Sequence, residues 1–242
     1  QDNSRVSLVG RNGAGKSTLF KAICGFVSAQ GKMTWQGKDL TSDSIKERAD
    51  KIGYVLQNPN QMISQKMIFD EVALGLRLRG VDPADIQTRV EKVLQVCGLY
   101  PFRHWPISAL SYGQKKRVTI ASILVLEPEM LILDEPTAGQ DYRHYTEMMV
   151  FLDELNRLGK TIVMITHDMH LMLEYSERTL VINDGKILAD GAPIDILTSP
   201  PLVKEAALKE TTLFTFATRL GLTDPIGFTQ RFIAFEEGGR VR

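Results

Sequence analysis

The feature that most constrains the fold is a glycine-rich octapeptide near the start of the chain, GRNGAGKS at residues 10–17. It follows an aliphatic run at residues 5–9, which is typical of a buried strand, and it precedes a helical pattern at residues 18–26. The octapeptide matches GxxxxGK followed by Ser or Thr, whose glycines let backbone N–H groups turn toward phosphate oxygens at a helix N-terminus. This phosphate loop, set between a strand and a helix, predicts an α/β domain.

The side chains of the phosphate loop indicate a nucleotide ligand. We expect Lys16 to bridge the β- and γ-phosphates and the Ser17 hydroxyl to bind Mg²⁺. The positive end of the helix dipole adds to the attraction for phosphate. The expected nucleotide-binding residues of the loop are Gly10, Asn12, Gly13, Ala14, Gly15, Lys16, Ser17 and Thr18.

A second candidate site lies where the apolar run at residues 130–133 ends in Asp134 and Glu135. Downstream of a phosphate loop, such a pair predicts an aspartate that binds Mg²⁺ and a glutamate that polarises the attacking water. Without that loop, the same pair would mean only that a strand had reached solvent.

Strand and helix patterns alternate along the chain, which favours a mainly parallel sheet. Turn signals at residues 35–38 and 183–186 predict small antiparallel edges, since Asp184 and Gly185 suit a type I′ turn. A helical pattern at about residues 66–126 predicts a helical subdomain inserted into the sheet domain. The expected strands lie at residues 5–9, 51–56, 130–133, 161–165 and 179–182.

The end of the chain follows a break at Ser199, Pro200 and Pro201. An amphipathic run at residues 202–220 and a short last segment after Pro225 come next. We therefore expect a sheet domain at residues 1–198 and a C-terminal accessory extension at residues 199–242. The chain opens at Gln1, close to its first strand, and we expect an N-terminally incomplete domain.

Composition argues against several classes of protein. Lys and Arg together number 29, as do Asp and Glu, so no excess of positive charge indicates nucleic acid as a partner. No apolar run approaches the roughly 20 residues of a spanning helix. Cys24 and Cys97 lack metal-ligand spacing and are expected to be buried free thiols in a reducing compartment.

Several motifs taken together resemble the nucleotide-binding domain of the ABC ATPases. The resemblance covers residues 5 to about 198 and implies the fold of the P-loop NTPases. It is carried by the phosphate loop, Gln57 after an apolar strand, the signature segment LSYGQ at residues 110–114, Asp134 with Glu135, Asp141, and His167 after a strand.

The resemblance implies a Mg²⁺-dependent ATPase that works as a head-to-tail pair of domains. Each ATP would lie between the phosphate loop of one domain and the signature segment of the other, so Ser111, Gly113 and Gln114 would bind the partner's ATP. An ordinary helix N-cap would also account for Ser111. Asp141 would organise the interface between the two domains.

The resemblance also assigns the catalytic residues. Glu135 would be joined by His167, which contacts the γ-phosphate, and by Gln57, which links Mg²⁺ and the attacking water to a membrane partner. Mg²⁺ would be held by Ser17, Gln57 and Asp134. A strand-end histidine or a loop glutamine can equally be a plain surface residue.

Two departures from the family pattern stand out. Tyr112 replaces the first glycine of the usual Ser-Gly-Gly-Gln, which restricts the backbone and predicts an altered or asymmetric half-site. The aromatic residue on which the family stacks adenine lies upstream of the first strand, where this chain has not yet begun. Adenine binding by the chain as given is therefore expected to be weakened.

The sequence after Gln57 and the long tail resemble the ATPases of energy-coupling-factor importers, in particular one half of a fused hydroxymethylpyrimidine or thiamine importer ATPase. This implies a peripheral protein on the cytoplasmic face of the cell membrane that powers uptake of a vitamin, a vitamin precursor or a metal ion. Its partners would be an integral-membrane component and a second ABC ATPase domain, in a homodimer, a heterodimer or one fused chain.

Two alternatives remain. One is a soluble ABC ATPase of translation or DNA repair, which the neutral charge disfavours. The other is a regulatory subunit with little hydrolysis, which Glu135 and His167 disfavour and Tyr112 leaves open.

Overall fold

The computed structural model describes residues 4–138, 142–208 and 212–240. Its contacts divide the chain into two compact units, one formed by residues 20–162 and the other by residues 4–19 together with residue 163 onward. The main sheet has six strands, in the order β4 (Ile52–Val55), β5 (Met130–Asp134), β6 (Thr161–Ile165), β1 (Arg5–Val9), β7 (Arg178–Asn183) and β8 (Lys186–Gly191). The predicted α/β fold, with a mostly parallel sheet and a small antiparallel edge, is confirmed.

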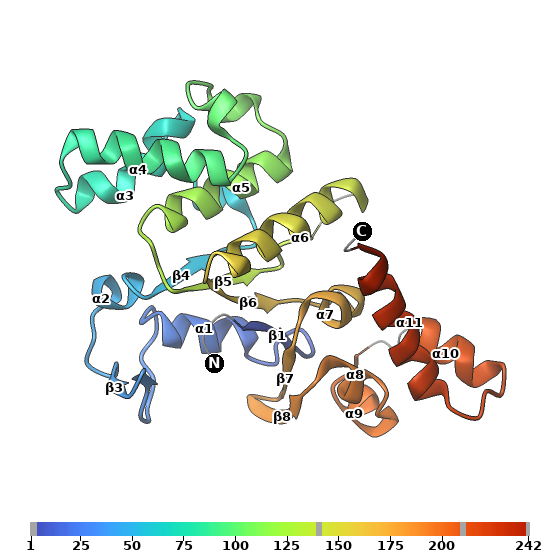
Figure 1. The fold of residues 1–242 in the computed structure, drawn as a ribbon. Coiled ribbons are helices and arrows are strands. Elements are labelled where there is room, and N and C mark those ends of the chain that lie inside the picture. Colours follow the sequence, from blue (N-terminus) through green and yellow to red (C-terminus); the bar gives the residue numbers. More distant parts are fainter. Residues whose placement is uncertain (1–3, 139–141, 209–211, 241–242) are drawn as a thin grey trace. The chain divides into compact units, whose positions relative to one another are not determined.

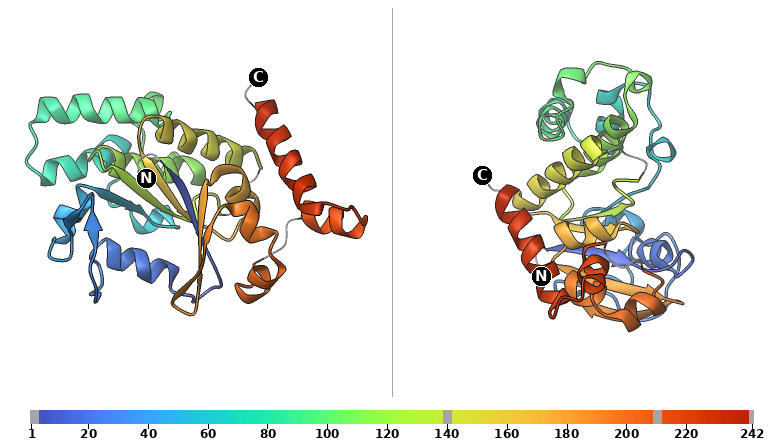
Figure 2. Two further views of the ribbon diagram at one scale, coloured as in Figure 1. Left: turned by 60° about the horizontal axis from the view of Figure 1, so that its bottom comes forward. Right: turned by 90° about the vertical axis from the view of Figure 1, so that its right-hand side faces the viewer.

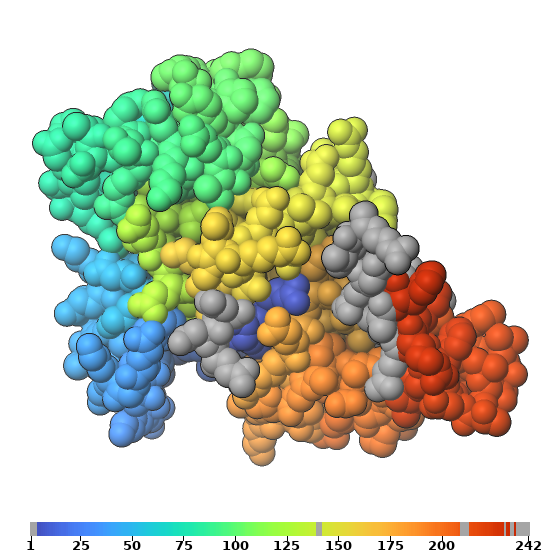
Figure 3. Space-filling model, in the orientation of Figure 1, coloured from blue at the N-terminus to red at the C-terminus, as the bar shows by residue number. Residues whose placement is uncertain are grey.

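The first unit carries β4 and β5, which pair in parallel with Tyr54 opposite Ile132. Three helices fill the stretch with helical periodicity, and they gather at one end of this unit (Figure 1; green and teal in Figure 3). Ile68, Val72 and Leu76 are fully buried at the spacing of one helix face. The three helices are α3 (Ile68–Leu78), α4 (Pro83–Val96) and α5 (Tyr112–Leu124).

The rest of the first unit is built from short elements around these strands. The ribbon of β2 (Thr34–Trp35) and β3 (Lys38–Asp39) turns at Gln36 and Gly37, which both have positive φ, as a type I′ turn requires. The remaining helical elements are α2 (Ile45–Ala49), α6 (Tyr142–Arg157) and single turns at Pro59–Gln61, Tyr100–Phe102 and Ile107–Ala109.

Helix α1 (Lys16–Ile23) begins two residues earlier than its pattern predicted and ends three residues sooner. The early end has a local cause. Gly25 adopts φ 82°, and the amides of Gly25 and Phe26 donate to the carbonyls of Ala22 and Lys21 at 3.1 and 2.8 Å. This is the hydrogen-bond pattern of a Schellman cap, which stops a helix.

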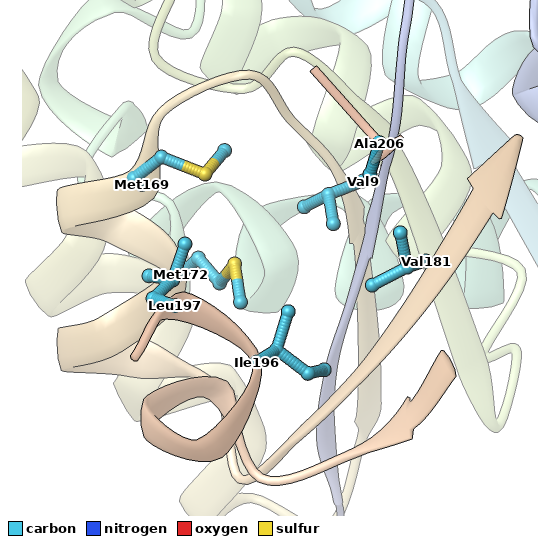
Figure 4. Close-up of a cluster of buried hydrophobic side chains, with 7 residues drawn as sticks. All are labelled: Val9, Met169, Met172, Val181, Ile196, Leu197 and Ala206. Atoms are coloured by element: carbon cyan, nitrogen blue, oxygen red, sulfur yellow. The ribbon is translucent and has the colours of Figure 1, made fainter. Parts of the chain in front are cut away.

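The second unit is organised around β1 and β7, which pair in parallel with Leu8 opposite Leu180. Strand β8 folds back on β7 through Asp184 and Gly185, whose φ angles are 47° and 74°, so the predicted type I′ turn is confirmed. Helices α7 (Met169–Tyr175) and α8 (Pro193–Leu197) pack against each other and, with these strands, enclose an apolar core (Figure 4). That core contains Val9, Met169, Met172, Val181, Ile196, Leu197 and Ala206.

The C-terminal segments differ in form from the sequence pattern. The run at residues 202–220 is not one helix, because α9 (Pro200–Glu205) is followed by Ala207 at φ 50°, which a right-handed helix cannot contain. Helix α10 (Thr212–Arg219) packs against α11 (Pro225–Arg240), and the two lie side by side in Figures 1 and 2. The expected short last segment is thus a helix of 16 residues.

Candidate functional site

The phosphate loop lies in the second unit, between β1 and α1. Gly10 has φ 146°, and a Cβ atom placed there would stand 1.9 Å from the backbone oxygen of Ile182 in β7. No side chain fits in that space, so glycine is required for the loop to leave the strand in this direction. Gly15 has φ 99°, a conformation that side chains disfavour, just before the first turn of α1.

The Lys16 ammonium group lies inside the phosphate loop. Lys16 is only 6% exposed, and its Nζ donates to the carbonyl oxygens of Gly10 at 2.8 Å and Arg11 at 2.9 Å. The loop is tied to the β7–β8 turn, because the amide of Gly185 donates to the carbonyl of Ala14 at 3.0 Å. A buried cation at the start of a helix makes this loop a preorganised site for an anion.

The other predicted loop residues lie around this cation. Ser17 is half-buried in the first turn of α1, Ala14 is buried, and Asn12, Gly13 and Thr18 are exposed. The loop therefore joins a buried positive centre to an accessible rim, which is what binding of a soluble phosphate compound requires.

His167 lies in the same unit, directly after β6, and is exposed. The amide of Thr166 donates to the carbonyl of Leu8 at 3.2 Å, so this segment runs beside the strand that leads into the phosphate loop. Asp168 is the N-cap of α7 and accepts from the amides of His170 and Leu171. The second unit thus holds His167 and the phosphate loop at the ends of neighbouring strands.

In the first unit, Asp134 is the last residue of β5 and Glu135 follows it. The Tyr54 hydroxyl donates to Oδ2 of Asp134 at 3.1 Å. Burial raises the pKa of Tyr54, and the negative charge of Asp134 raises it further, so the phenol stays protonated as a donor. Sequence reasoning missed Tyr54, whose only signal was its place in the strand before Gln57.

The backbone of Glu135 is strained. Its φ of 46° lies in the left-handed region, which is costly for a residue with a side chain. Non-glycine residues held in this region concentrate at functional sites, where the surrounding structure enforces them. The strain therefore marks the residue that the sequence predicts as the catalytic base.

Gln57 is exposed and lies two residues after the end of β4. Its backbone oxygen accepts hydrogen bonds from Nζ of Lys116 at 2.9 Å and from the Tyr112 hydroxyl at 3.1 Å. Lys116 also donates to the carbonyls of Leu56 at 2.7 Å and Asp134 at 3.2 Å. Burial lowers the pKa of Lys116 to about 8, an effect that the carboxylates of Asp134 and Glu135 oppose.

Sequence reasoning also missed Lys116, although a signal for it was present. Lys116, Ile120 and Leu124 recur every four residues along α5, and all three are buried. A lysine in register with an apolar helix face is a candidate for burial.

The signature segment forms the start of α5. The Ser111 hydroxyl accepts from the Gln114 amide at 3.3 Å, and Oε1 of Gln114 accepts from the Ser111 amide at 3.0 Å. This reciprocal pair is a capping box, so the N-cap interpretation of Ser111 is confirmed. An open hollow of about 410 Å³ lies beside it, lined among others by Gly113, Arg117 and Arg143.

The predicted site residues thus fall into two sets. The phosphate loop and His167 belong to the second unit, whereas Gln57, Asp134, Glu135 and the signature segment belong to the first. Asp141 lies outside the described residues.

The predicted Mg²⁺ ligands are the Ser17 hydroxyl, the Gln57 amide and the Asp134 carboxylate. These are hard oxygen donors of the kind Mg²⁺ prefers, so the donor set fits the ion. Within the described residues, no group of three or more His, Cys, Asp or Glu side chains forms a metal site. Cys24 and Cys97 are buried free thiols, as predicted, and burial raises their pKa values to about 11 and about 12.

The helices of the described part of the chain include none with the length and hydropathy needed to cross a bilayer.

Comparisons with known proteins agree on one family. The model of the ABC transporter family matches residues 1–138. A protein of Enterococcus faecalis is 69% identical over 232 residues, which are 96% of this chain and 41% of that protein. A protein of Lactobacillus johnsonii is 63% identical over 232 residues, 96% of this chain and 40% of the relative. Both carry the provisional name ABC transporter ATP-binding protein, and this chain spans about two fifths of their length.

A solved structure is also similar. The cbiO1 protein of Clostridium perfringens, described as part of the ABC transporter complex cbiONQ, is 30% identical to this chain. The two superpose with a TM-score of 0.78, over 92% of this chain and 89% of that protein.

Proposed function

The chain belongs to the ABC transporter family of ATPases, and from this premise we propose that it is an ATP-hydrolysing domain that energises import across a membrane. The observation that carries ATP binding is the phosphate loop, in which Lys16 is buried and bound to two loop carbonyls beside a helix N-terminus. Triphosphate is a highly charged ligand, and this loop offers a fixed cation and oriented amides to bind it.

We propose a hydrolytic role for the first unit. Glu135 would polarise the attacking water and accept its proton, while Tyr54 holds the Asp134 carboxylate in place. His167 would contact the γ-phosphate from the second unit. Ser17, Gln57 and Asp134 would hold Mg²⁺, which when bound neutralises charge that develops on the phosphate oxygens.

We further propose that the signature segment serves the ATP of a second ABC domain. The hollow beside Ser111 and Gly113 is bordered by Arg117 and by Arg143, which pairs with Glu147 of the same lining at 3.1 Å, and we propose that a partner's phosphate groups would bind at this arginine pair. Gln114 closes the capping box that orients this helix end. Asp141 would lie at the interface between the two domains. The second domain would be a separate copy, a different subunit or the rest of a fused chain, which the longer relatives favour.

The proposed task is import of an energy-coupling-factor type, at the cytoplasmic face of the membrane and through an integral-membrane partner. The similarity to cbiO1, which is described as part of an ABC transporter complex, supports a role in a transporter of several components. The proposed cargo is a vitamin, a vitamin precursor or a metal ion. Residues 199–242 are proposed as an accessory extension, attached through Val203 and Ala206, which are buried in the second unit.

The test uses the full-length natural chain with its membrane partner, reconstituted in proteoliposomes. We expect Mg²⁺-dependent ATP hydrolysis, and we expect Glu135→Gln to lower kcat about a hundredfold or more while ATP still binds. The variant should trap ATP in a stable pair of domains, detectable as bound nucleotide that is retained after free ATP is removed.

The matched control is Glu127→Gln, a change at an exposed glutamate that follows α5 in the same unit. It should hydrolyse ATP like the natural chain. Unchanged turnover in Glu135→Gln would refute the proposed base. Slow turnover in the natural chain itself would favour a regulatory subunit.

A further inference from the structure

We propose that Tyr112 and Lys116 are positioning residues that fasten the Gln57 loop to the signature helix α5 of the same subunit. The proposal rests on the proposed ATPase function and deepens it. Through this fastening, a movement of the signature helix would be passed to Gln57 and to the peptide bond before Glu135.

The first observation is that two donors from one helix meet on one acceptor. Tyr112 and Lys116 stand four residues apart on α5, so their side chains leave the helix from the same face. The Tyr112 hydroxyl lies 3.1 Å from the backbone oxygen of Gln57, and Nζ of Lys116 lies 2.9 Å from the same atom. A carbonyl oxygen has two lone pairs, and these two donors match that capacity.

The second observation is the set of acceptors around Lys116, which is 1% exposed. Its ammonium group has three protons, and it donates to three carbonyl oxygens, those of Leu56, Gln57 and Asp134. Burying an ammonium group is costly unless such partners compensate. The three hydrogen bonds compensate this burial at the point where the ends of β4, β5 and the signature helix converge.

The third observation concerns Glu135. The Asp134 oxygen that Lys116 binds belongs to the peptide bond joining Asp134 to Glu135. Glu135 has φ 46°, a strained conformation that needs support from its surroundings. Lys116 holds the peptide unit that directly precedes the strained φ rotation of Glu135. It therefore acts on the orientation of the proposed catalytic base without touching substrate.

The fourth observation explains Tyr112 itself. A glycine at this position, as in the usual family pattern, has no side chain that could reach Gln57. Among the described residues, those with positive φ do not include Tyr112, so the tyrosine sits in α5 without backbone strain. The substitution therefore adds a contact between two motifs and leaves the helix intact.

The experiment measures amide hydrogen exchange and ATP hydrolysis in the full-length chain with its membrane partner. Tyr112→Phe removes only the hydroxyl, and Lys116→Met removes the charge at similar length. We expect amides of residues 56–61 to exchange at least about tenfold faster in Lys116→Met and several-fold faster in Tyr112→Phe. We expect kcat to fall in the same order, with the KM for ATP changed less than about twofold.

Two control substitutions change residues of the same types as Lys116 and Tyr112 in the same unit. Lys115→Met alters the adjacent lysine, and Tyr100→Phe alters a tyrosine in the helical stretch of the same unit. Both variants should match the natural chain in amide exchange and in kcat. If Lys116→Met does not fold, Lys116→Arg takes its place, and we expect it to retain the charge but to lose part of kcat, because a longer, planar guanidinium would place its N–H donors differently from the ammonium group.

The outcomes separate this proposal from the function it rests on. Unchanged exchange at residues 56–61 in both Tyr112→Phe and the Lys116 variant would overturn the fastening, whatever the ATPase rate. Faster exchange with unchanged kcat would also overturn it, because the contact would then be structural only. A natural chain that does not hydrolyse ATP would refute the proposed function, and the exchange result would still decide the contact.

Discussion

The phosphate loop and the Gln57 loop are both expected to serve ATP, but they are held in place by different means. The phosphate loop is shaped by its own glycines and by backbone contacts with β7 and the β7–β8 turn, and Lys16 binds loop carbonyls five and six residues away. The Gln57 loop is held by side chains that are 55 and 59 residues distant, Tyr112 and Lys116.

The two loops therefore differ in what a change elsewhere in the chain would do to them. Backbone contacts fix the shape of the phosphate loop, which suits a preorganised site for phosphate. A loop held by a distant helix changes when that helix moves, which suits a residue expected to report to a membrane partner. Four changes test the contrast.

The largest effect is expected at the centre of the phosphate loop. Lys16→Ala removes the buried cation, and we expect ATP affinity to fall at least about a hundredfold, because charge-assisted bonds to phosphate are lost. Calorimetry with ATP and Mg²⁺ measures this. Lys21→Ala, on the exposed face of the same helix, should bind ATP normally. Equal affinity in Lys16→Ala would refute the phosphate site.

The next change tests whether the loop depends on its backbone. Gly10→Ala forces a Cβ atom against the Ile182 oxygen, and we expect a loss of about 3 kcal/mol in the free energy of unfolding, from overpacking and an unfavourable φ. Thermal or urea unfolding measures it. At Gly13 the φ is 81° but the surrounding space is open, so Gly13→Ala should cost only about 1 to 2 kcal/mol. Equal losses of unfolding free energy in the two variants would show that the structure around residue 10 relaxes and relieves the clash.

A smaller effect is expected where a distant side chain supports the site. Tyr54→Phe removes the donor to Asp134, and we expect kcat to fall by about three- to tenfold and more Mg²⁺ to be needed for half-maximal rate. Hydrolysis rates over a Mg²⁺ titration measure both quantities. Tyr100→Phe is the matched control. An unchanged Mg²⁺ dependence would mean that Tyr54 does not position the aspartate.

The smallest effect on stability is expected for Ser111→Ala. This variant separates the capping role of Ser111 from its proposed role in binding the partner's ATP. Ser111→Ala breaks a capping box, and we expect a loss of about 1 kcal/mol. Ser44→Ala breaks the capping box of α2, which lies outside the predicted site, and should cost a similar amount. Only Ser111→Ala should also slow hydrolysis. If the two variants hydrolyse ATP equally well, Ser111 is a cap and nothing more.

Much of the fold could be predicted because its signals are local. Residues 5–9 and 161–165 form strands at the predicted positions, and Asp184 with Gly185 makes the predicted turn. The C-terminal end could not be predicted in the same way. An amphipathic pattern at residues 202–220 does not reveal that Ala207 adopts a left-handed conformation, where the amides of Ala207 and Leu208 donate to the carbonyls of Lys204 and Val203 and α9 ends.

The candidate site shows the same limit. The conformation of the phosphate loop and the capping of α5 by Ser111 follow from residue type and spacing, because the loop glycines, Lys16 and Ser111 act on atoms within a few residues of themselves. Tyr54 gave no such signal. Its hydroxyl reaches Asp134 only because β4 and β5 pair in parallel with Val55 opposite Leu133.

The sequence by itself therefore determined the family, the phosphate loop, the strand and turn pattern and the helix caps, since these depend on local conformation and short spacing. Only the tertiary structure decided what Lys116 and Tyr112 do. Their contacts with Gln57 require that one face of α5 lie against the end of β4, and no local pattern specifies which distant carbonyl a side chain will meet.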